Sequence, residues 1–306
     1  QSAHWGTVHP QWHSTRTDDD SGARTGRFSS SPNFQNMKDT ENQERLIASL
    51  VELDPTVKEW WLPDIRNYVT ARKGRVIIGR DYSQIELRVT AEFEDGPIQC
   101  RYQEEPLMDL HQWAIDLIKA NSGITVQRRI AKNVGFGIIY GAGGNAIAAQ
   151  AKVPYETAVE LKNLYLQAFP SIKSLMQEVQ NRGRDGGYVT TIGGRKYHTE
   201  PAKIIDGQWR SFEYKLLNYL VQGSAADLMK EAMCEYVDSA GYEKYGDSLI
   251  MTVHDEMVAE VPARTCSKSL ANMQHAMISN TLTRKMLVPI LSTGYFGRTW
   301  GSTKDV

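Results

Sequence analysis

The sequence has few cysteines and no long apolar run. Its three cysteines, Cys100, Cys234 and Cys266, lie far apart without the CxxC spacing of a zinc or redox site, so a reducing intracellular compartment is expected. No apolar stretch approaches the roughly 20 residues that span a bilayer. Residues 1–15 show no apolar core behind a basic start, which argues against a secretory signal. These absences exclude a disulfide scaffold and a membrane role, and they favour the cytoplasm.

The chain also lacks an excess of charge of either sign. It carries 35 basic and 36 acidic residues, with 41% hydrophobic and 23% charged residues, which is the composition of a globular protein. If such a chain binds nucleic acid, its basic residues must gather on one surface. At 306 residues it can form one or two lobes, since a single core stops growing near this size.

Helical patterns alternate with a few strong strand signals. The polar start, residues 1–26, is predicted to be mostly loop. The periodicity predicts a helix over about 41–53, a strand over 75–79 that runs into Asp81, a helical lobe over 107–182, a long helix over 211–240, and a hairpin of strands 248–253 and 257–261. Together these elements predict an α+β fold.

Two aspartates stand where predicted strands end. Asp81 follows the apolar run 75–79, and Asp255 lies at the tip of the predicted hairpin. Taken alone, each is most simply a turn former or a helix cap. If they face one another at about 4 Å, two carboxylates repel by about 4 kcal/mol at an effective dielectric of 20, so the pairing makes sense only around a cation. Magnesium suits such a site, because it binds a few carboxylates together with substrate phosphate oxygens.

A second signal lies on the segment 127–141. Arg128, Lys132, Phe136 and Tyr140 are spaced by four and share one side of a predicted helix, which is basic at its start and aromatic at its end. That order suits a nucleoside triphosphate, although a solvated amphipathic helix explains the pattern too. Glycines within the segment weaken a helix, which hints at a hinge or a closely approaching ligand.

Together these segments resemble a known family. The stretches 81–88, 127–141 and 253–256 resemble, in that order, the three polymerase motifs of family A DNA polymerases, the class of bacterial DNA polymerase I. The segments 25–36 and 222–230 also agree. The resemblance implies an antiparallel palm sheet with a helical fingers subdomain, and a DNA-directed DNA polymerase that adds deoxynucleotides to a primer 3'-hydroxyl by two-metal-ion catalysis.

The resemblance also assigns the catalytic centre. It implies that Asp81 and Asp255 bind two Mg²⁺ ions, with Mn²⁺ as a substitute, and that the Tyr82 backbone carbonyl is a further ligand. Glu256 is implied as a nearby catalytic residue. Lys132 is implied as a candidate proton donor to the departing pyrophosphate.

Nucleotide and DNA contacts follow from the same resemblance. Glu86 is implied to exclude ribonucleotides, because its side chain fills the space beside C2 of the sugar. Phe136, which lacks a tyrosine hydroxyl, implies poor use of dideoxynucleotides. The implied dNTP-binding residues are Arg128, Lys132, Phe136, Tyr140, Glu86 and Gln84, and those implied to touch the DNA minor groove are Arg27, Asn218, Gln222 and His254. Taken alone, Glu86 is more simply a solvated helix residue. Loop or helix-surface hydrogen bonding likewise explains Arg27, Asn218, Gln222 and His254 more simply.

The sequence departs from the family pattern in several places. Residues 37–65 form an insert, Tyr214 replaces a usual Arg, and Gly135 replaces a usual Asn. Only 24 residues precede Thr25, where relatives place a thumb and an exonuclease-like domain, so these domains are expected to be absent from this chain. The expected partners are primer–template DNA, dNTPs and a separate chain or missing N-terminal region that supplies the thumb and exonuclease.

The expected domains follow from the motifs. Residues 1–24 are expected to be a flexible segment or thumb remnant, 25–96 the first part of the palm, 97–210 the fingers, and 211–306 the second part of the palm. The resemblance implies a role in replication or repair, and the expected location is a bacterial cytoplasm or, for a virus-encoded chain, that of the infected host. The alternatives are a non-catalytic DNA-binding fragment or subunit and a single-subunit RNA polymerase; Glu86 and the tip at 254–255 argue against the latter.

Overall fold

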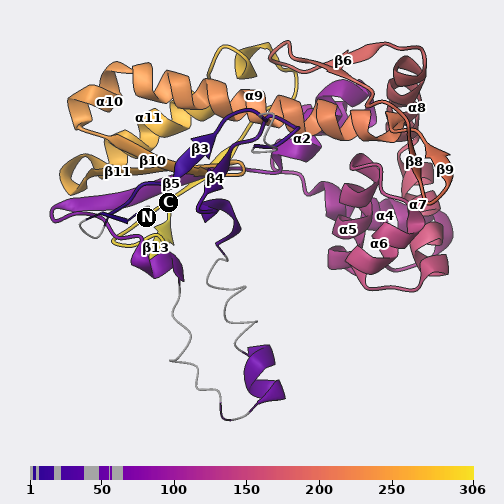
Figure 1. Cartoon of the computed structure of the whole chain (residues 1–306), viewed down its shortest axis with the longest axis horizontal. Helices are drawn as coiled ribbons and strands as arrows, with labels where there is room; N and C mark the ends of the chain where they lie inside the picture. The colour runs from indigo at the N-terminus through magenta and orange to yellow at the C-terminus, as the bar shows by residue number, and fades with distance from the viewer. Residues whose placement is uncertain (1–2, 5–6, 17–21, 38–47, 55, 57–64) are drawn as a thin grey trace. The chain divides into compact units, whose positions relative to one another are not determined.

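The computed structural model describes residues 3–4, 7–16, 22–37, 48–54, 56 and 65–306 (Figure 1). The chain divides into two compact units. Unit 1 comprises residues 1–83, 229–284 and 291–306, and unit 2 comprises residues 84–228 and 285–290. In the part of the chain that is described, no helix combines the length and apolar character needed to cross a membrane.

Unit 1 is built on a five-stranded antiparallel sheet. Its order is β10-β11-β5-β12-β13, so β5 lies in the centre. The strands are β5 (Arg75–Tyr82), β10 (Ser248–Val253), β11 (Glu256–Pro262), β12 (Ser292–Gly297) and β13 (Thr303–Asp305). The predicted strand and hairpin are thereby confirmed, and β5 extends through Asp81. A central strand buried on both faces explains the near-continuous apolar run that precedes this aspartate.

The two faces of this sheet are covered differently. Tyr82 donates a hydrogen bond from its hydroxyl to the Met277 carbonyl (3.0 Å), so its face packs on helix α11 (Cys266–Ile278). Because side chains alternate along a strand, Ile77, Gly79 and Asp81 belong to the opposite face. There Ile77 joins a core cluster with Val258 and Trp300. The strand therefore directs Asp81 away from α11.

The remaining elements of unit 1 are short. They are β1 (Ala3–His4), β2 (Thr7–Val8), β3 (Gln11–His13), β4 (Ser29–Ser31), α10 (Ala240–Tyr245), and the 3₁₀ turns η1 (Phe34–Asn36), η3 (Ile65–Tyr68) and η5 (Ala263–Thr265). The 3₁₀ turn η6 (Thr283–Lys285) begins in unit 1 and ends in unit 2. The expectation of a mostly loop start was incomplete, because β1 pairs with β2 and β3 pairs with β4. Strands this short leave little periodicity to detect. Residues 48–53 are helical, while 41–47 of the predicted helix and most of the predicted insert, residues 38–47, 55 and 57–64, lie outside the described residues.

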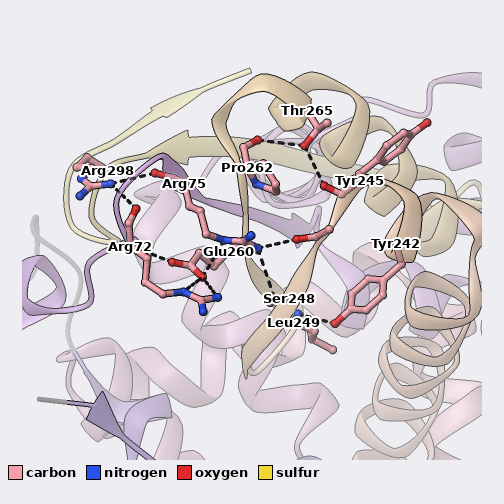
Figure 2. Close-up of polar contacts among 11 residues, drawn as sticks. Arg72, Arg75, Tyr242, Tyr245, Ser248, Leu249, Glu260, Pro262, Thr265 and Arg298 are labelled. Atoms are coloured by element: carbon pink, nitrogen blue, oxygen red, sulfur yellow. Dashed lines mark hydrogen bonds and ion pairs between the residues drawn. The ribbon is translucent and has the colours of Figure 1, made fainter. Parts of the chain in front are cut away.

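A buried carboxylate fixes the turn that precedes β5 (Figure 2). Glu260 of β11 accepts from Arg72 Nε (2.8 Å) and pairs with Arg75 Nε (3.0 Å). Arg298 donates to the carbonyls of Arg72 (2.7 Å) and Arg75 (3.1 Å), which joins the chain after β12 to the same turn. Burial alone would raise the pKa of Glu260, but the hydrogen bonds and charge of Arg72, with the charge of Arg75, outweigh it and lower the pKa.

Unit 2 is mainly helical. Its helices are α2 (Ile85–Glu94), α3 (Pro97–Glu104), α4 (Leu110–Ser122), α5 (Arg128–Ile139), α6 (Gly144–Ala151), α7 (Tyr155–Ala168) and α8 (Pro170–Arg184), with the hairpins β6 (Tyr188–Thr190) with β7 (Lys196–His198) and β8 (Lys203–Ile205) with β9 (Gln208–Arg210) and the 3₁₀ turn η4 (Glu213–Lys215). Helix α9 (Leu216–Asp238) begins in unit 2 and ends in unit 1. This mixture of helices with an antiparallel sheet confirms the α+β class. The palm and fingers boundaries stay a prediction.

Packing within unit 2 explains the glycines of α5. A Cβ on Gly135 would lie 3.0 Å from the Tyr165 hydroxyl oxygen, and one on Gly137 would lie 2.8 Å from Ile147 Cγ1. Gly141 has φ +70°, and a Cβ there would lie 2.4 Å from the Tyr214 carbonyl oxygen. Neighbouring side chains and backbone of the same unit thus occupy the space beside these glycines. Close packing accounts for their lack of a side chain, and the expected hinge stays a prediction.

The Glu260 network gives a test of stability. Because the pKa of Glu260 is lowered on folding, its charge stabilises the folded state above the ordinary pKa of 4.5, and this contribution is lost as pH falls through the lowered value. Glu260→Gln should reduce the free energy of unfolding at pH 7 by about 1–3 kcal/mol, since it leaves two arginines without their buried partner. Denaturant unfolding across pH 3–7 measures this.

The exposed Glu243→Gln is the control, and its loss should be small at every pH. A Glu260→Gln deficit that stays constant down to pH 3 would contradict this account of the ion pair.

Candidate active site

Three acidic residues meet where β5 ends. Asp81 is the strand partner of Glu256 in the β5–β11 pairing, and Asp255 stands at the tip of the β10–β11 hairpin. The Tyr82 amide donates to the Asp255 carbonyl (3.1 Å), which ties the tip to the end of β5. His254 adopts a left-handed backbone conformation (φ 56°), which closes the tight turn. Residues far apart in the sequence are thus held together by strand pairing.

The charges of this cluster oppose one another. Asp81 is accessible to solvent on one side, yet the surrounding protein removes much of its hydration. This desolvation, followed by the charges of Asp255 and Glu256, raises the pKa of Asp81 to about 8. Burial likewise raises the pKa of Glu256, although hydrogen bonds from Tyr295 and Trp300 counteract it. The charge of Arg66 also lowers the pKa of Glu256.

The donor set can be tested for a divalent metal ion. No group of three or more His, Cys, Asp and Glu side chains suited to a metal occurs in the described ranges, so a closed metal cage is not built there. The charge of Asp255 raises the pKa of Asp81, and such a pair fits a different kind of site, in which Mg²⁺ takes its other ligands from water, backbone oxygens and phosphate. Asp81, Asp255 and the Tyr82 carbonyl fit that kind of site, and their assignment as ligands stays a prediction.

Helix α5 brings the basic and aromatic candidates together. Arg128 Nε donates to Asp109 Oδ2 (2.8 Å), and the same carboxylate group accepts from the His111 and Gln112 amides at the start of α4. Lys132 Nζ lies 5.9 Å from the centroid of the Phe136 ring. Sequence analysis assigned no role to Asp109, but its helix-capping position was a readable signal. It orients Arg128, which remains 57% exposed and can meet an anion.

The aromatic end of α5 contacts the Glu86 carboxylate. Phe136 and Tyr140 stack with centroids 5.8 Å apart, and the Tyr140 hydroxyl donates to Glu86 Oε2 (2.5 Å). Glu86 is only 7% exposed, which excludes the alternative of a solvated helix residue. Gln84 has a left-handed backbone (φ 55°) at the start of α2 and accepts from the Tyr102 hydroxyl (3.2 Å). All candidates for dNTP binding therefore lie within unit 2.

A neutral histidine borders this group. The His111 ring lies 5.5 Å from that of Phe136. Burial lowers the pKa of His111 to about 4; the charge of Asp109 opposes this shift, and the charges of Arg128 and Lys132 add to it. His111 is thus an uncharged packing surface at neutral pH. It adds no charge to the basic start of α5.

The candidates for DNA binding are distributed between the units. Arg27, half-buried, and His254, exposed, belong to unit 1, whereas Asn218 and Gln222 lie one turn apart on the part of α9 in unit 2. The Asn218 side-chain carbonyl is buried without a hydrogen-bond partner among the described residues. An unsatisfied polar atom of this kind is uncommon in native proteins and fits a contact made elsewhere. The role in DNA binding stays a prediction.

Comparison with known proteins identifies the fold and the family of this chain. The structure matches the POL domain of Pol1 from M. smegmatis, solved in complex with DNA primer–template and dNTP, with a TM-score of 0.76 and 23% identity over 98% of this chain and 49% of that one. The fold is therefore that of a polymerase domain. The family model for DNA polymerase family A matches residues 2–302, so the chain belongs to that family. The predicted family resemblance and fold class are confirmed.

Curated relatives agree with this placement. The chain is 29% identical to thermostable DNA polymerase I of Thermus aquaticus over 306 residues and 30% identical to that of Thermus thermophilus over 305 residues, covering 98% of this chain in each case. It is 29% identical to DNA polymerase I of Bacillus caldotenax over 92% of its length. The chain spans about a third of the length of these relatives, between 30% and 33%.

The raised pKa of Asp81 predicts a pH-dependent stability in metal-free buffer. An unfolded aspartate ionises near 3.8, whereas the folded one does so near 8, so the folded state retains a proton that the unfolded state has lost. The free energy of unfolding should therefore decrease as pH rises between these values. In Asp81→Asn this decrease should be shallower, as measured by urea unfolding with EDTA at a series of pH values.

Asp305→Asn, on the exposed end of β13, should keep the slope of the parent chain. Equal slopes in the parent and Asp81→Asn would show that the acidic cluster does not strain the folded state.

Proposed function

We propose that the chain carries out template-directed addition of deoxynucleotides to a primer 3'-hydroxyl, with release of pyrophosphate, in DNA replication or repair. The observation that carries the proposal is the pairing of Asp81 with the Asp255 and Glu256 tip, which brings three acidic side chains together at the end of β5. Membership of DNA polymerase family A supports the same reaction. The chain spans about a third of the length of its curated relatives, so the polymerase activity of those full-length proteins is only proposed for this chain.

In unit 1, the proposed catalytic work belongs to the acidic cluster. Two Mg²⁺ ions, or Mn²⁺, would supply activation of the primer hydroxyl and neutralisation of phosphate charge. Asp81, Asp255 and the Tyr82 carbonyl would hold them, and the pairing of β5 with β11 keeps these groups in register before substrate arrives. Such fixed placement matters because preorganised charges need no rearrangement during the reaction.

In unit 2, the proposed work is recognition of the nucleotide. Arg128 and Lys132 would neutralise the triphosphate, and Lys132 would protonate the departing pyrophosphate. Phe136, Tyr140 and Gln84 would pack against the nucleotide. The buried Glu86, held by Tyr140, would reject a 2'-hydroxyl, because a rigid carboxylate cannot move aside.

The proposed partners follow from this reaction. They are primer–template DNA, with minor-groove contacts from Arg27, Asn218, Gln222 and His254, and dNTPs. A separate chain or further N-terminal residues would supply a thumb and an exonuclease. The proposed domains are a palm of residues 25–96 and 211–306 and fingers of residues 97–210, and the proposed location is the cytoplasm of a bacterium or an infected host cell.

Primer extension tests the function. With a primer–template, dNTPs and Mg²⁺, Asp81→Asn and Asp255→Asn should each slow extension by at least about 10³-fold, because each removes a charge that the metal ions require. Asp305→Asn is the matched control and should extend at the rate of the parent chain.

Extension that survives either substitution would contradict the metal assignment. A parent chain that binds DNA without extending it, even with the thumb region of a relative supplied in trans, would favour a non-catalytic subunit. Extension with ribonucleotides alone would favour an RNA polymerase.

Phe136 allows a sharper test of the sugar site. Phe136→Tyr places a hydroxyl where a dideoxynucleotide lacks its own, so the variant should incorporate dideoxynucleotides at least about tenfold better relative to dNTPs. Phe296→Tyr adds the same hydroxyl on β12 in unit 1 and should leave the ratio unchanged. Competition between ddNTP and dNTP in single-nucleotide extension measures the ratio; an unaltered ratio in Phe136→Tyr would remove Phe136 from the sugar site.

A further inference from the structure

Strand register brings Tyr295 and Glu256 together across β5. In the β5–β12 pairing Tyr295 stands opposite Gly79, and in the β5–β11 pairing Glu256 stands opposite Asp81. Gly79 and Asp81 are two residues apart and belong to the same face of the sheet, as do the residues paired with them. A side chain from β12 must therefore cross the central strand above Gly79 to reach Glu256 on β11.

Gly79 provides the space for this crossing. A Cβ at Gly79 would lie 2.1 Å from Tyr295 Cζ and 2.2 Å from its hydroxyl oxygen, closer than any side chain tolerates. The phenol ring thus occupies the position that a side chain on β5 would take. Any residue larger than glycine at position 79 would displace the ring.

Two donors converge on one oxygen of Glu256. The Tyr295 hydroxyl and Trp300 Nε1 (3.1 Å) both donate to Oε1, and Trp300 Nε1 also lies 3.1 Å from the Tyr295 hydroxyl. Trp300 is itself fixed, since it is 2% exposed and its amide donates to the Val69 carbonyl (2.9 Å). The Arg66 guanidinium lies 4.1 Å above its ring. Glu256 is therefore held by groups that cannot easily move.

We propose that Tyr295, seated over Gly79, acts with Trp300 as a positioning residue that fixes Glu256 beside Asp81 and prevents it from becoming a third carboxylate ligand of the metal ions. To turn toward a metal ion, Glu256 must break two hydrogen bonds to a buried carboxylate oxygen, which leaves the donors of Tyr295 and Trp300 without this acceptor. The proposal rests on the proposed function.

Holding Glu256 in place keeps coordination positions on the metal ion open for substrate. Mg²⁺ requires six ligands and must keep places open for phosphate oxygens and water. A third carboxylate would occupy one of these places and would hold the ion more tightly without substrate. Fixing Glu256 leaves Asp81 and Asp255 as the carboxylate ligands, with Glu256 as a nearby acceptor of hydrogen bonds.

The first test measures the contact without metal. In EDTA, Tyr295→Phe and Glu256→Gln are combined in a double-mutant cycle of urea unfolding. Because they share one hydrogen bond, the effects should be non-additive by about tenfold in the unfolding equilibrium constant. Tyr242→Phe, which removes a hydroxyl that accepts from the Leu249 amide in unit 1, should combine additively with Glu256→Gln. Additivity in the Tyr295 cycle would overturn the proposal.

The second test measures Mn²⁺ binding to the metal-free chain by electron paramagnetic resonance. Tyr295→Phe should bind Mn²⁺ about 3- to 10-fold more tightly, because Glu256 becomes free to ligate, and adding Glu256→Gln should abolish the gain. Gly79→Ala should resemble Tyr295→Phe if it folds, and Tyr242→Phe should match the parent chain. An affinity unchanged by Tyr295→Phe, or a gain that survives Glu256→Gln, would overturn the proposal.

Failure of the proposed function gives a different result. If Asp81→Asn binds Mn²⁺ as tightly as the parent chain does, the metal site itself is contradicted. The unfolding cycle in EDTA would still decide whether Tyr295 holds Glu256.

Discussion

Repulsion between carboxylates at the end of β5 is the constraint on which the rest of unit 1 depends. Asp81 carries a pKa of about 8 because partial desolvation and the charges of Asp255 and Glu256 disfavour its ionised form. Separate loops would swing apart under such repulsion. The strand pairing on both sides of β5 prevents this, since β11 and β12 each pair with the strand through Asp81. The sheet therefore holds these acidic side chains together, and the proposed function places the metal ions there.

The same sheet is secured at its opposite end. There Glu260 binds Arg72 and Arg75, so β11 carries one acid with cationic partners and another, Glu256, with neutral donors. The arginines lower the pKa of Glu260, while burial raises the pKa of Glu256. One strand thus places two glutamates in contrasting surroundings. The difference separates a carboxylate that stabilises the fold from one that belongs to the proposed catalytic centre.

Unit 2 carries the exposed cations to which the proposed function assigns the triphosphate. Arg128 is oriented by Asp109 yet remains more than half exposed, and Lys132 lies along an aromatic ring. Burial keeps His111 neutral beside them, so the positive charge stays on the first turns of α5. Glu86 is held by the Tyr140 hydroxyl at the other end of the same helix face. Because Arg128, Lys132, Phe136 and Tyr140 are spaced by four residues, they share one helix face, with the basic side chains at its start and the aromatic side chains at its end.

The sequence by itself determined the family, the α+β class, the central strand with its hairpin and the helix face of Arg128 to Tyr140, because local periodicity and ordered motifs carry that information. It could not decide why Gly135 and Gly137 are glycines, since the answer lies in Tyr165 and Ile147 from other helices. Only the tertiary structure placed Tyr295 above Gly79 and beside Glu256, because cross-strand register joins residues that no local pattern relates.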